Sequence, residues 1–387
     1  MKKLNLFENI DGLGLCRLLS SKTAVFAVLL FFGFFGVSWS QIDVPVSEAT
    51  IVKANTIDEQ VAEKTYNAGV ELFQKGNYSA AIAKFDAAIK EKGNYEKAYT
   101  NRASAKKELG NIDGAMEDFN KAIYISPSAA AYFGRGQCYY QKKNKEAAMK
   151  DYSSALSLDD TYEQAFYYRG GLYFEKGDYS NAILDYDKAI KNKSDYAYAY
   201  NDRGSANRQL GKYVESAKDY QEACRLMPST VFFFNNYGSA LRKGQEYELA
   251  IKAYTQAIKL DPRNYLSYNL RGLTYYEMAQ YERAILDFDT CVQLNSQYGF
   301  AYMNRSDAYY KLFNYSSALE DGNKAVELMP KDGNAYANRG NFREMMRDAK
   351  GACQDWNKAA ELGNAAAKKY VKTQCIQSKN DNDHDQQ

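Results

Sequence analysis

The chain has 387 residues, enough for two or three globular domains or for one long repeat array. It carries 50 Lys and Arg against 48 Asp and Glu, a net charge of +2, and the first 40 residues account for this surplus. The neutral remainder gives no electrostatic basis for binding nucleic acid or an anionic membrane surface, so neither is predicted as a partner.

Histidine usage excludes whole classes of active site. The only histidine is His384, within the polar stretch 378–387, which has nothing to fold around. A Ser-His-Asp or Cys-His nucleophile system therefore cannot be assembled. Histidine-ligated zinc is excluded for the same reason, and no Cys-x-x-Cys pair replaces it. We predict no catalytic residues, no metal, no cofactor and a disordered tail over 377–387.

Residues 1–40 are predicted to be a targeting segment. An uncharged, almost entirely apolar run from Thr23 to Val37 follows a stretch of net positive charge, with the small residues Ser38 and Ser40 after it. This pattern fits a signal peptide cut before Gln41, and the run is short for a membrane span, which needs about 20 residues. The leader is long for a signal peptide, so an uncleaved anchor stays open. Either way we expect a periplasmic or extracellular protein.

A polar linker is expected over 41–61, and beyond it the sequence repeats itself. Nine copies, numbered here as repeats 1 to 9, start near Ala62, Glu96, Ala129, Glu163, Ala197, Val231, Tyr265, Gly299 and Gly333. Position 8 of each copy is Gly, Ala or Ser, position 20 is Ala or Ser, and position 27 is Ala or Cys. Position 24 is aromatic except in repeat 8, where Gly322 is expected to leave an underpacked spot.

This period and its small/aromatic pattern resemble the tetratricopeptide-repeat (TPR) family. The resemblance implies an all-α, right-handed superhelical solenoid of nine helical hairpins over 62–364, with a capping helix over 365–376. Small residues let two antiparallel helices approach closely while the aromatic residue fills the space beside them. A single hairpin cannot bury its own apolar face, so the array is expected to be stabilised by stacking.

An arginine ladder allows two interpretations. Position 7 is arginine in seven repeats: Arg102, Arg135, Arg169, Arg203, Arg271, Arg305 and Arg339. Seven arginines in register could bind phosphate, but position 23 of the same repeats is always Asp, and repeats 1 and 6 lack both residues. Positions 7 and 23 are symmetric about the hairpin turn. We therefore predict an Arg–Asp pair within each of the seven repeats.

Two cysteines are predicted to form a disulfide. Cys353 and Cys375 lie about equally far from Gly363-Asn364, the expected turn into the capping helix, so an antiparallel pair places them opposite each other. Outside the cytoplasm such a pair can oxidise, and the closed loop is expected to stabilise the end of the array by about 3 kcal/mol. Cys138, Cys224 and Cys291 fall at or beside packing positions and are expected to be inert buried thiols.

The resemblance also implies a concave groove, lined by the first helix of each hairpin, in which family members bind peptides. The densest aromatic group on those helices is Phe133, Tyr140, Tyr167, Tyr168 and Phe174, in repeats 3 and 4. Because Tyr recurs throughout the chain, a ligand platform and ordinary packing between repeats both stay open for this group.

Asparagines are the other predicted groove feature, chiefly Asn201, Asn235 and Asn269 at position 5. A carboxamide can donate to and accept from a peptide backbone without reading its sequence. The leading hypothesis is a non-catalytic scaffold of the bacterial cell envelope that binds a protein or peptide in the groove. The alternative is a module that binds cell-wall glycans through the same aromatic and Asn side chains.

Overall fold

The computed structural model describes residues 57–375, and every regular element in that range is helical. The first helices of repeats 1 to 9 are α2 (Ile57–Gln74), α4 (Glu96–Glu108), α6 (Ala129–Gln141), α8 (Glu163–Glu175), α10 (Ala197–Gln209), α12 (Val231–Lys243), α14 (Tyr265–Glu277), α16 (Gly299–Lys311) and α18 (Gly333–Met345). The second helices are α3 (Tyr78–Glu91), α5 (Ile112–Ile125), α7 (Lys145–Leu158), α9 (Tyr179–Asn192), α11 (Tyr213–Leu226), α13 (Tyr247–Leu260), α15 (Tyr281–Leu294), α17 (Tyr315–Leu328) and α19 (Ala349–Glu361).

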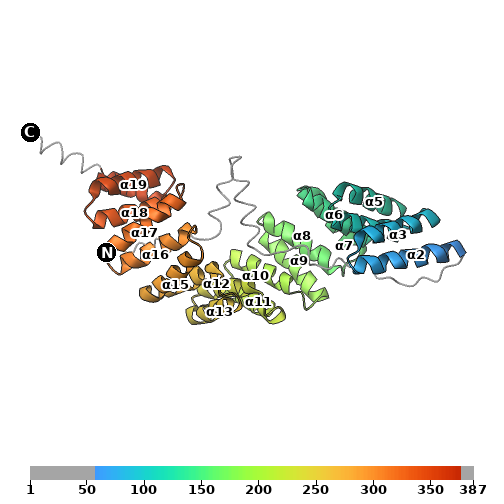
Figure 1. Cartoon of the computed structure of the whole chain (residues 1–387), viewed down its shortest axis with the longest axis horizontal. Coiled ribbons are helices and arrows are strands. Elements are labelled where there is room, and N and C mark those ends of the chain that lie inside the picture. Colours follow the sequence, from blue (N-terminus) through green and yellow to red (C-terminus); the bar gives the residue numbers. More distant parts are fainter. Residues whose placement is uncertain (1–56, 376–387) are drawn as a thin grey trace, which may run out of the picture.

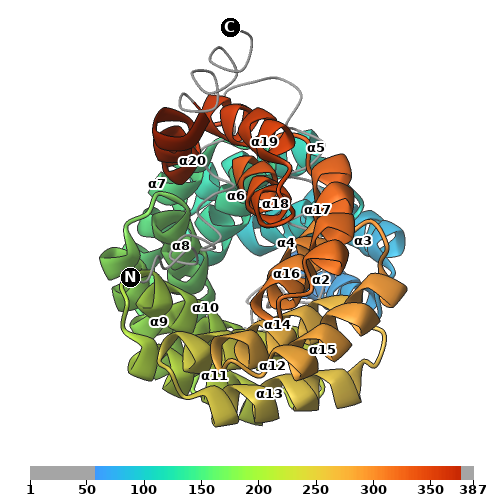
Figure 2. The same ribbon diagram turned by 90° about the vertical axis from the view of Figure 1, so that its left-hand side faces the viewer.

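The predicted solenoid of nine hairpins is confirmed, and the hairpins stack into a superhelix (Figure 1). Viewed end-on in Figure 2, the first helices such as α10, α12 and α14 lie toward the axis, and the second helices such as α11 and α13 form the outer layer. Helix α2 begins at Ile57, inside the predicted linker. The predicted targeting segment and polar tail lie outside the described residues, and no helix among those described is long and apolar enough to cross a bilayer.

Each hairpin except that of repeat 8 closes over the aromatic ring at position 24. The ring lies directly over position 8 of the same repeat: a Cβ added to Gly69 would lie 2.6 Å from Phe85 Cε1, and one on Gly340 would lie 2.6 Å from Trp356 Nε1. These rings and the alanines at positions 20 and 27 are almost fully buried. Where position 8 is glycine, the close approach of the ring leaves little room for a side chain; repeat 2 instead has Ala103 there.

The turn between the two helices uses a left-handed residue at position 15. Four repeats place glycine there, with φ between 74° and 79°, whereas the other five use Lys143, Gln245, Ala279, Phe313 and Arg347, with φ between 59° and 67°. Position 16 often caps the second helix, as when Asn111 accepts from the amide of Gly114 at 3.0 Å. This one-residue left-handed turn reverses the chain in every repeat.

The expectation of an underpacked spot at Gly322 is wrong. Phe342, from position 10 of repeat 9, fills the space, and a Cβ added to Gly322 would lie 3.1 Å from its ring. Phe342 is 1% exposed. The missing aromatic side chain of repeat 8 is therefore supplied by the following repeat.

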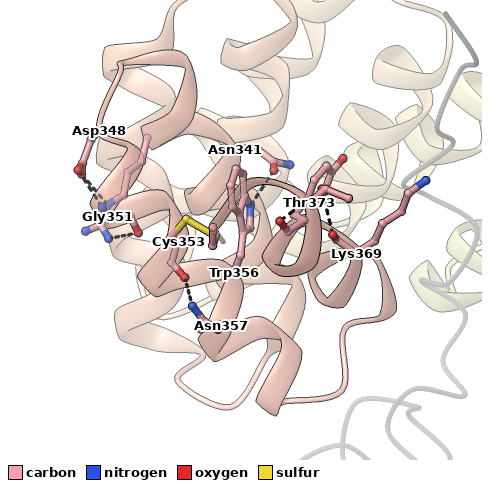
Figure 3. Close-up of a disulfide and its surroundings, with 11 residues drawn as sticks. Asn341, Asp348, Gly351, Cys353, Trp356, Asn357, Lys369 and Thr373 are labelled. Carbon is pink, nitrogen blue, oxygen red and sulfur yellow. Dashed lines mark hydrogen bonds and ion pairs between the residues drawn. A yellow bond between two sulfur atoms is a disulfide. The ribbon is translucent and has the colours of Figure 1, made fainter. Parts of the chain in front are cut away.

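The last hairpin is covered by α20 (Ala365–Tyr370) and a π-helical turn, η2 (Val371–Cys375). The rings of Trp356 and Tyr370 stack with their centroids 5.1 Å apart, and Ala367 is fully buried. Figure 3 shows the disulfide between Cys353 and Cys375, whose Cα atoms are 5.6 Å apart. The cap therefore shields the end of the core with two contacts, one aromatic and one through sulfur.

We predict that this disulfide forms in the purified protein and that reduction loosens the cap. Mass spectrometry should find Cys353 and Cys375 linked, and reductant should lower the stability of the C-terminal end by about 3 kcal/mol. A variant with both cysteines changed to Ser is the control, because reductant should leave its unfolding unchanged. Two free thiols at these positions would contradict the prediction.

Candidate functional site

The arginine ladder is fully used within the solenoid. In each of the seven repeats the guanidinium donates through Nε and Nη2 to both carboxylate oxygens of the predicted Asp, as between Arg169 and Asp185 at 2.8 Å for each bond. The seven aspartates are 3% to 6% exposed. The predicted pairing within each repeat is confirmed, and its geometry is the bidentate one that favours arginine over lysine.

Each ladder arginine also contacts the preceding repeat, which we did not predict. Its third nitrogen, Nη1, reaches position 25 of that repeat, for example Asn120 from Arg135 at 2.8 Å and Thr255 from Arg271 at 3.1 Å. The guanidinium also lies over the ring at position 4 of its own helix, 5.4 Å from its centroid for Arg203 over Tyr200. All three nitrogens of each guanidinium therefore have partners within the solenoid. The arginine ladder cross-links neighbouring repeats and does not form a phosphate site.

Of the two interpretations left open for the predicted aromatic group, burial favours packing between repeats for three of its five members. Phe133 and Tyr167 are each 1% exposed and Tyr168 is 7% exposed, and all three belong to the core of repeats 3 to 5. Tyr140 and Phe174 are half-buried. Tyr140 donates to Glu175 at 2.6 Å, and the ring of Phe174 packs edge-on against Tyr179. The three buried rings, those of Phe133, Tyr167 and Tyr168, are covered by neighbouring side chains and cannot stack on a ligand.

The predicted groove asparagines are also buried, and they connect neighbouring repeats. Position 5 of one repeat bonds to position 6 of the next: Asn236 donates to Asn201 at 2.9 Å, and Asn304 donates to Asn269 at 2.9 Å. Asn235 instead accepts from Ser267 at 2.9 Å. These carboxamides therefore hold the first helices together. A search of the sequence for polar residues 35 positions apart would have indicated these contacts between asparagines.

The inner face does carry an apolar stripe, farther along the array than predicted. Position 2 lies three residues before position 5 and therefore on the same helix face. In four consecutive repeats it holds a large apolar or aromatic side chain that is only half-buried: Tyr198, Phe232, Leu266 and Phe300. We call these four residues the inner stripe. None of the four was among the predicted site residues; a comparison of position 2 across the repeats would have indicated them.

Two carboxylates on the inner face, those of Asp202 and Asp307, have raised pKa values. Burial raises the pKa of Asp307 to about 7, against the opposing effects of Lys311 and of the bond from Asn338 at 2.9 Å. Burial also raises the pKa of Asp202 to about 6, although Tyr167 and Asn201 donate to it at 2.7 and 2.8 Å. Neither Asp forms an ion pair within 57–375.

Acidification should therefore stabilise the fold through Asp307. The folded chain holds this proton more tightly than the unfolded chain, whose Asp ionises near pH 4, so stability is lost as pH rises through about 7. We predict that Asp307→Asn unfolds at a higher urea concentration than the parent at pH 8, and that this advantage shrinks toward pH 5. Equal pH dependence of the two unfolding midpoints would contradict the assignment.

Comparison with known proteins agrees with this architecture. Models described as tetratricopeptide repeat match 96–128, 129–162, 197–230, 265–298 and 299–332, and a model described as TPR repeat matches 170–211 and 238–279. Together these matches span more than half of the chain. No curated protein matches the chain significantly.

Several solved structures are similar. The C-terminal part of a TPR repeat-containing protein from Cytophaga hutchinsonii is 18% identical, with a TM-score of 0.51 over 62% of this chain and 98% of that one. A tetratricopeptide repeat protein from Parabacteroides merdae is 19% identical, with a TM-score of 0.44 over 64% and 99% of the two chains. Yeast Tom70 is 13% identical, with a TM-score of 0.46 over 83% and 97%. At these identities the likeness concerns the fold alone.

Proposed function

Because this chain belongs to the tetratricopeptide-repeat family, whose repeats generally bind proteins or peptides, we propose that it is a scaffold that binds a segment of a partner protein. The proposed site is the inner face of repeats 5 to 8, on helices α10, α12, α14 and α16. The observation that carries the proposal is the inner stripe, a row of half-buried apolar side chains at one position of four consecutive repeats.

The inner stripe supports binding because it differs from the rest of that helix face. Positions 5 and 6 are mostly occupied by bonds between neighbouring repeats, so they contribute to stacking. Position 2 holds half-buried apolar side chains instead, which pack partly against the core and leave the rest of their surface in water. Exposed apolar surface is typical of interaction sites. A partner that covers the stripe would remove this surface from water.

We further propose that the scaffold works outside the cytoplasm, in the cell envelope or beyond it. The apolar run 23–37 after a positively charged stretch supports this location. The disulfide between Cys353 and Cys375 agrees with it, because disulfides persist in oxidising compartments. N-terminal sequencing of the mature protein from fractionated cells tests the location, and a chain that starts at Met1 in the cytosolic fraction would contradict it.

A glycan ligand is not proposed. The aromatic side chains that suggested it, chiefly Phe133, Tyr167 and Tyr168, are buried in the core and cannot stack on a sugar ring. The asparagines of the same hypothesis bond to neighbouring repeats. A segment of polypeptide remains the ligand that fits the inner stripe.

The proposal is tested with short random peptides displayed on phage and selected on the purified protein. Selected peptides should bind the parent, and a variant with Tyr198, Phe232, Leu266 and Phe300 changed to Ala should bind them at least about tenfold more weakly. Circular dichroism shows whether this variant stays helical.

A matched control removes the same kind of surface from the outer helices. Leu184, Val214, Leu249 and Leu286 supply one apolar side chain to each of repeats 4 to 7 and are between 44% and 66% exposed. Changing these four residues to Ala should leave peptide binding unchanged. If the outer variant loses binding and the inner variant keeps it, the site lies elsewhere and the proposal fails.

A further inference from the structure

Seven of the eight junctions between neighbouring repeats carry the same bond on their outer side. In each of them the ladder arginine, already paired with the Asp of its own repeat, donates through Nη1 to position 25 of the repeat before it. The acceptors are Asp86, Asn120, Ser153, Asp187, Thr255, Asp289 and Asn323, at 2.5 to 3.2 Å. Position 25 belongs to the second, outer helix. We call this bond the outer cross-link.

The junction between repeats 5 and 6 lacks the outer cross-link. Position 7 of repeat 6 is Tyr237, and position 25 of repeat 5 is Gln221. Repeat 1 also has no arginine at position 7, but no repeat precedes it among the described residues. Repeat 6 has Ala253 at position 23 as well, so no Arg–Asp pair joins its two helices. The arginine ladder is therefore interrupted at one internal junction.

Side-chain size is exchanged across this junction. At each of the other seven junctions, position 28 of the first repeat is Ile, Leu or Val, and position 3 of the second is Ala or Ser. Here position 28 is Cys224 and position 3 is Phe233, which is fully buried in the same apolar cluster. The ring of Phe233 meets Tyr198 edge-on, with centroids 5.6 Å apart. Apolar contacts are non-directional, so they hold two repeats together without fixing their relative orientation.

A polar contact is kept on the inner side of the junction, where Asn236 of α12 donates to Asn201 of α10 at 2.9 Å. The junctions before and after it keep their outer cross-links, through Arg203 and Arg271. A guanidinium bonded through three nitrogens fixes orientation as well as distance. Repeats 1–5 and repeats 6–9 are therefore each held as a block, and the blocks meet at a junction bonded on its inner side alone by these ladder positions.

We propose that the junction between repeats 5 and 6 is a hinge, about which repeats 1–5 and repeats 6–9 bend as two blocks. The bend pivots on the bond between Asn201 and Asn236 and opens the outer side, between α11 and α13. Sliding of packed helices is a common source of such motion. The hinge lies between Tyr198 and the other three members of the inner stripe, so bending changes the width of that face. The hinge goes beyond the proposed function and holds whether or not the stripe binds a peptide.

Double electron–electron resonance between paired spin labels tests the hinge in the purified protein. Position 22 is exposed in the even repeats, at Glu117, Leu184, Lys252 and Glu320. Labels attached to a genetically encoded ketone amino acid leave the native cysteines untouched. Three pairs, joining 117 with 184, 184 with 252 and 252 with 320, each span two junctions, and only the second pair spans the hinge. We expect a broader distance distribution for the second pair than for the other two. Equal widths for all three pairs would overturn the hinge.

A variant that supplies the missing cross-link tests its cause. Tyr237→Arg is combined with Gln221→Asp and Ala253→Asp, and Phe234 at position 4 already offers a ring for the new guanidinium, as in the other ladder repeats. The distribution between labels at 184 and 252 should narrow to the width of the flanking pairs. If circular dichroism shows a folded variant whose distribution is as broad as that of the parent, the proposal is overturned.

Thr255→Val gives a second test that does not depend on the folding of the triple variant. It removes the acceptor that Arg271 reaches across the junction between repeats 6 and 7, and leaves the pair with Asp287 intact. The distribution between labels at 252 and 320 should then broaden, while that between 117 and 184 stays unchanged. A distribution between 252 and 320 as narrow as in the parent would show that the outer cross-link does not control bending, and the proposal would fail.

Discussion

Phe342→Ala should destabilise the C-terminal end of the array by about 3–5 kcal/mol, the usual cost of truncating a buried phenylalanine. The ring is 1% exposed and fills the space beside Gly322, where the other eight repeats place their own aromatic side chain. Its loss opens a cavity between repeats 8 and 9 that no neighbouring side chain can fill. Urea unfolding should show a lower midpoint, and amide exchange should accelerate in α17 and α18.

A compensating variant distinguishes the loss of a ring that replaces the one missing from repeat 8 from a general loss of apolar volume. Repeat 8 also has Ser306 at position 8, where a ring at position 24 requires the absence of a large side chain. Ser306→Gly and Gly322→Phe added to Phe342→Ala rebuild the pattern of the other repeats. This triple variant should regain stability relative to Phe342→Ala. If the triple variant is the less stable of the two, the exchange between repeats is not the reason for Gly322.

Arg169→Met should cost about 3 kcal/mol, because it leaves the carboxylate of Asp185 buried without its counter-charge. Asp185 is 5% exposed, and Arg169 is its bidentate partner. Burial already raises the pKa of Asp185 despite that partner. Without Arg169 the pKa rises further, so the loss should be largest at neutral pH and shrink as acidification protonates the carboxyl.

The double variant Arg169→Met with Asp185→Leu should recover most of this loss, since two apolar side chains of similar volume remove the buried charge. Arg225→Met is the surface control, because Arg225 pairs with Glu222 on the exposed side of α11, and no measurable change is expected. Urea unfolding at pH 5 and pH 7.5 measures all three. A double variant as unstable as Arg169→Met would show that packing, not charge, causes the loss.

The sequence was sufficient for the fold because the repeat period, the small residues and the position-24 ring all depend on contacts within one hairpin. The Arg–Asp pairs were predictable for the same reason. Contacts between repeats were not: Phe342 replaces a ring missing from another repeat, and Asn201 bonds to a residue 35 positions away. Those contacts depend on how far one hairpin is shifted and rotated against the next, which the period alone does not specify.

The burial of Phe133, Tyr167 and Tyr168 was not predictable, for a related reason. Position 5 lies on the inner face but also against the next first helix, so the large ring of Tyr167 packs into that junction instead of facing the groove. Position 2 lies one turn nearer the start of the helix, where the side chains of the inner stripe stay half-buried. Residue type alone could not distinguish the two positions.

Binding on the inner face is tested with a photo-crosslinking phenylalanine analogue placed at Phe232, in the inner stripe, or at Leu286, on the outer helix α15. Each protein is irradiated with a peptide selected on the parent, and the crosslinked product is quantified by mass spectrometry. We predict a crosslink from position 232 and none from position 286. A crosslink from 286 without one from 232 would contradict binding on the inner face of repeats 5 to 8.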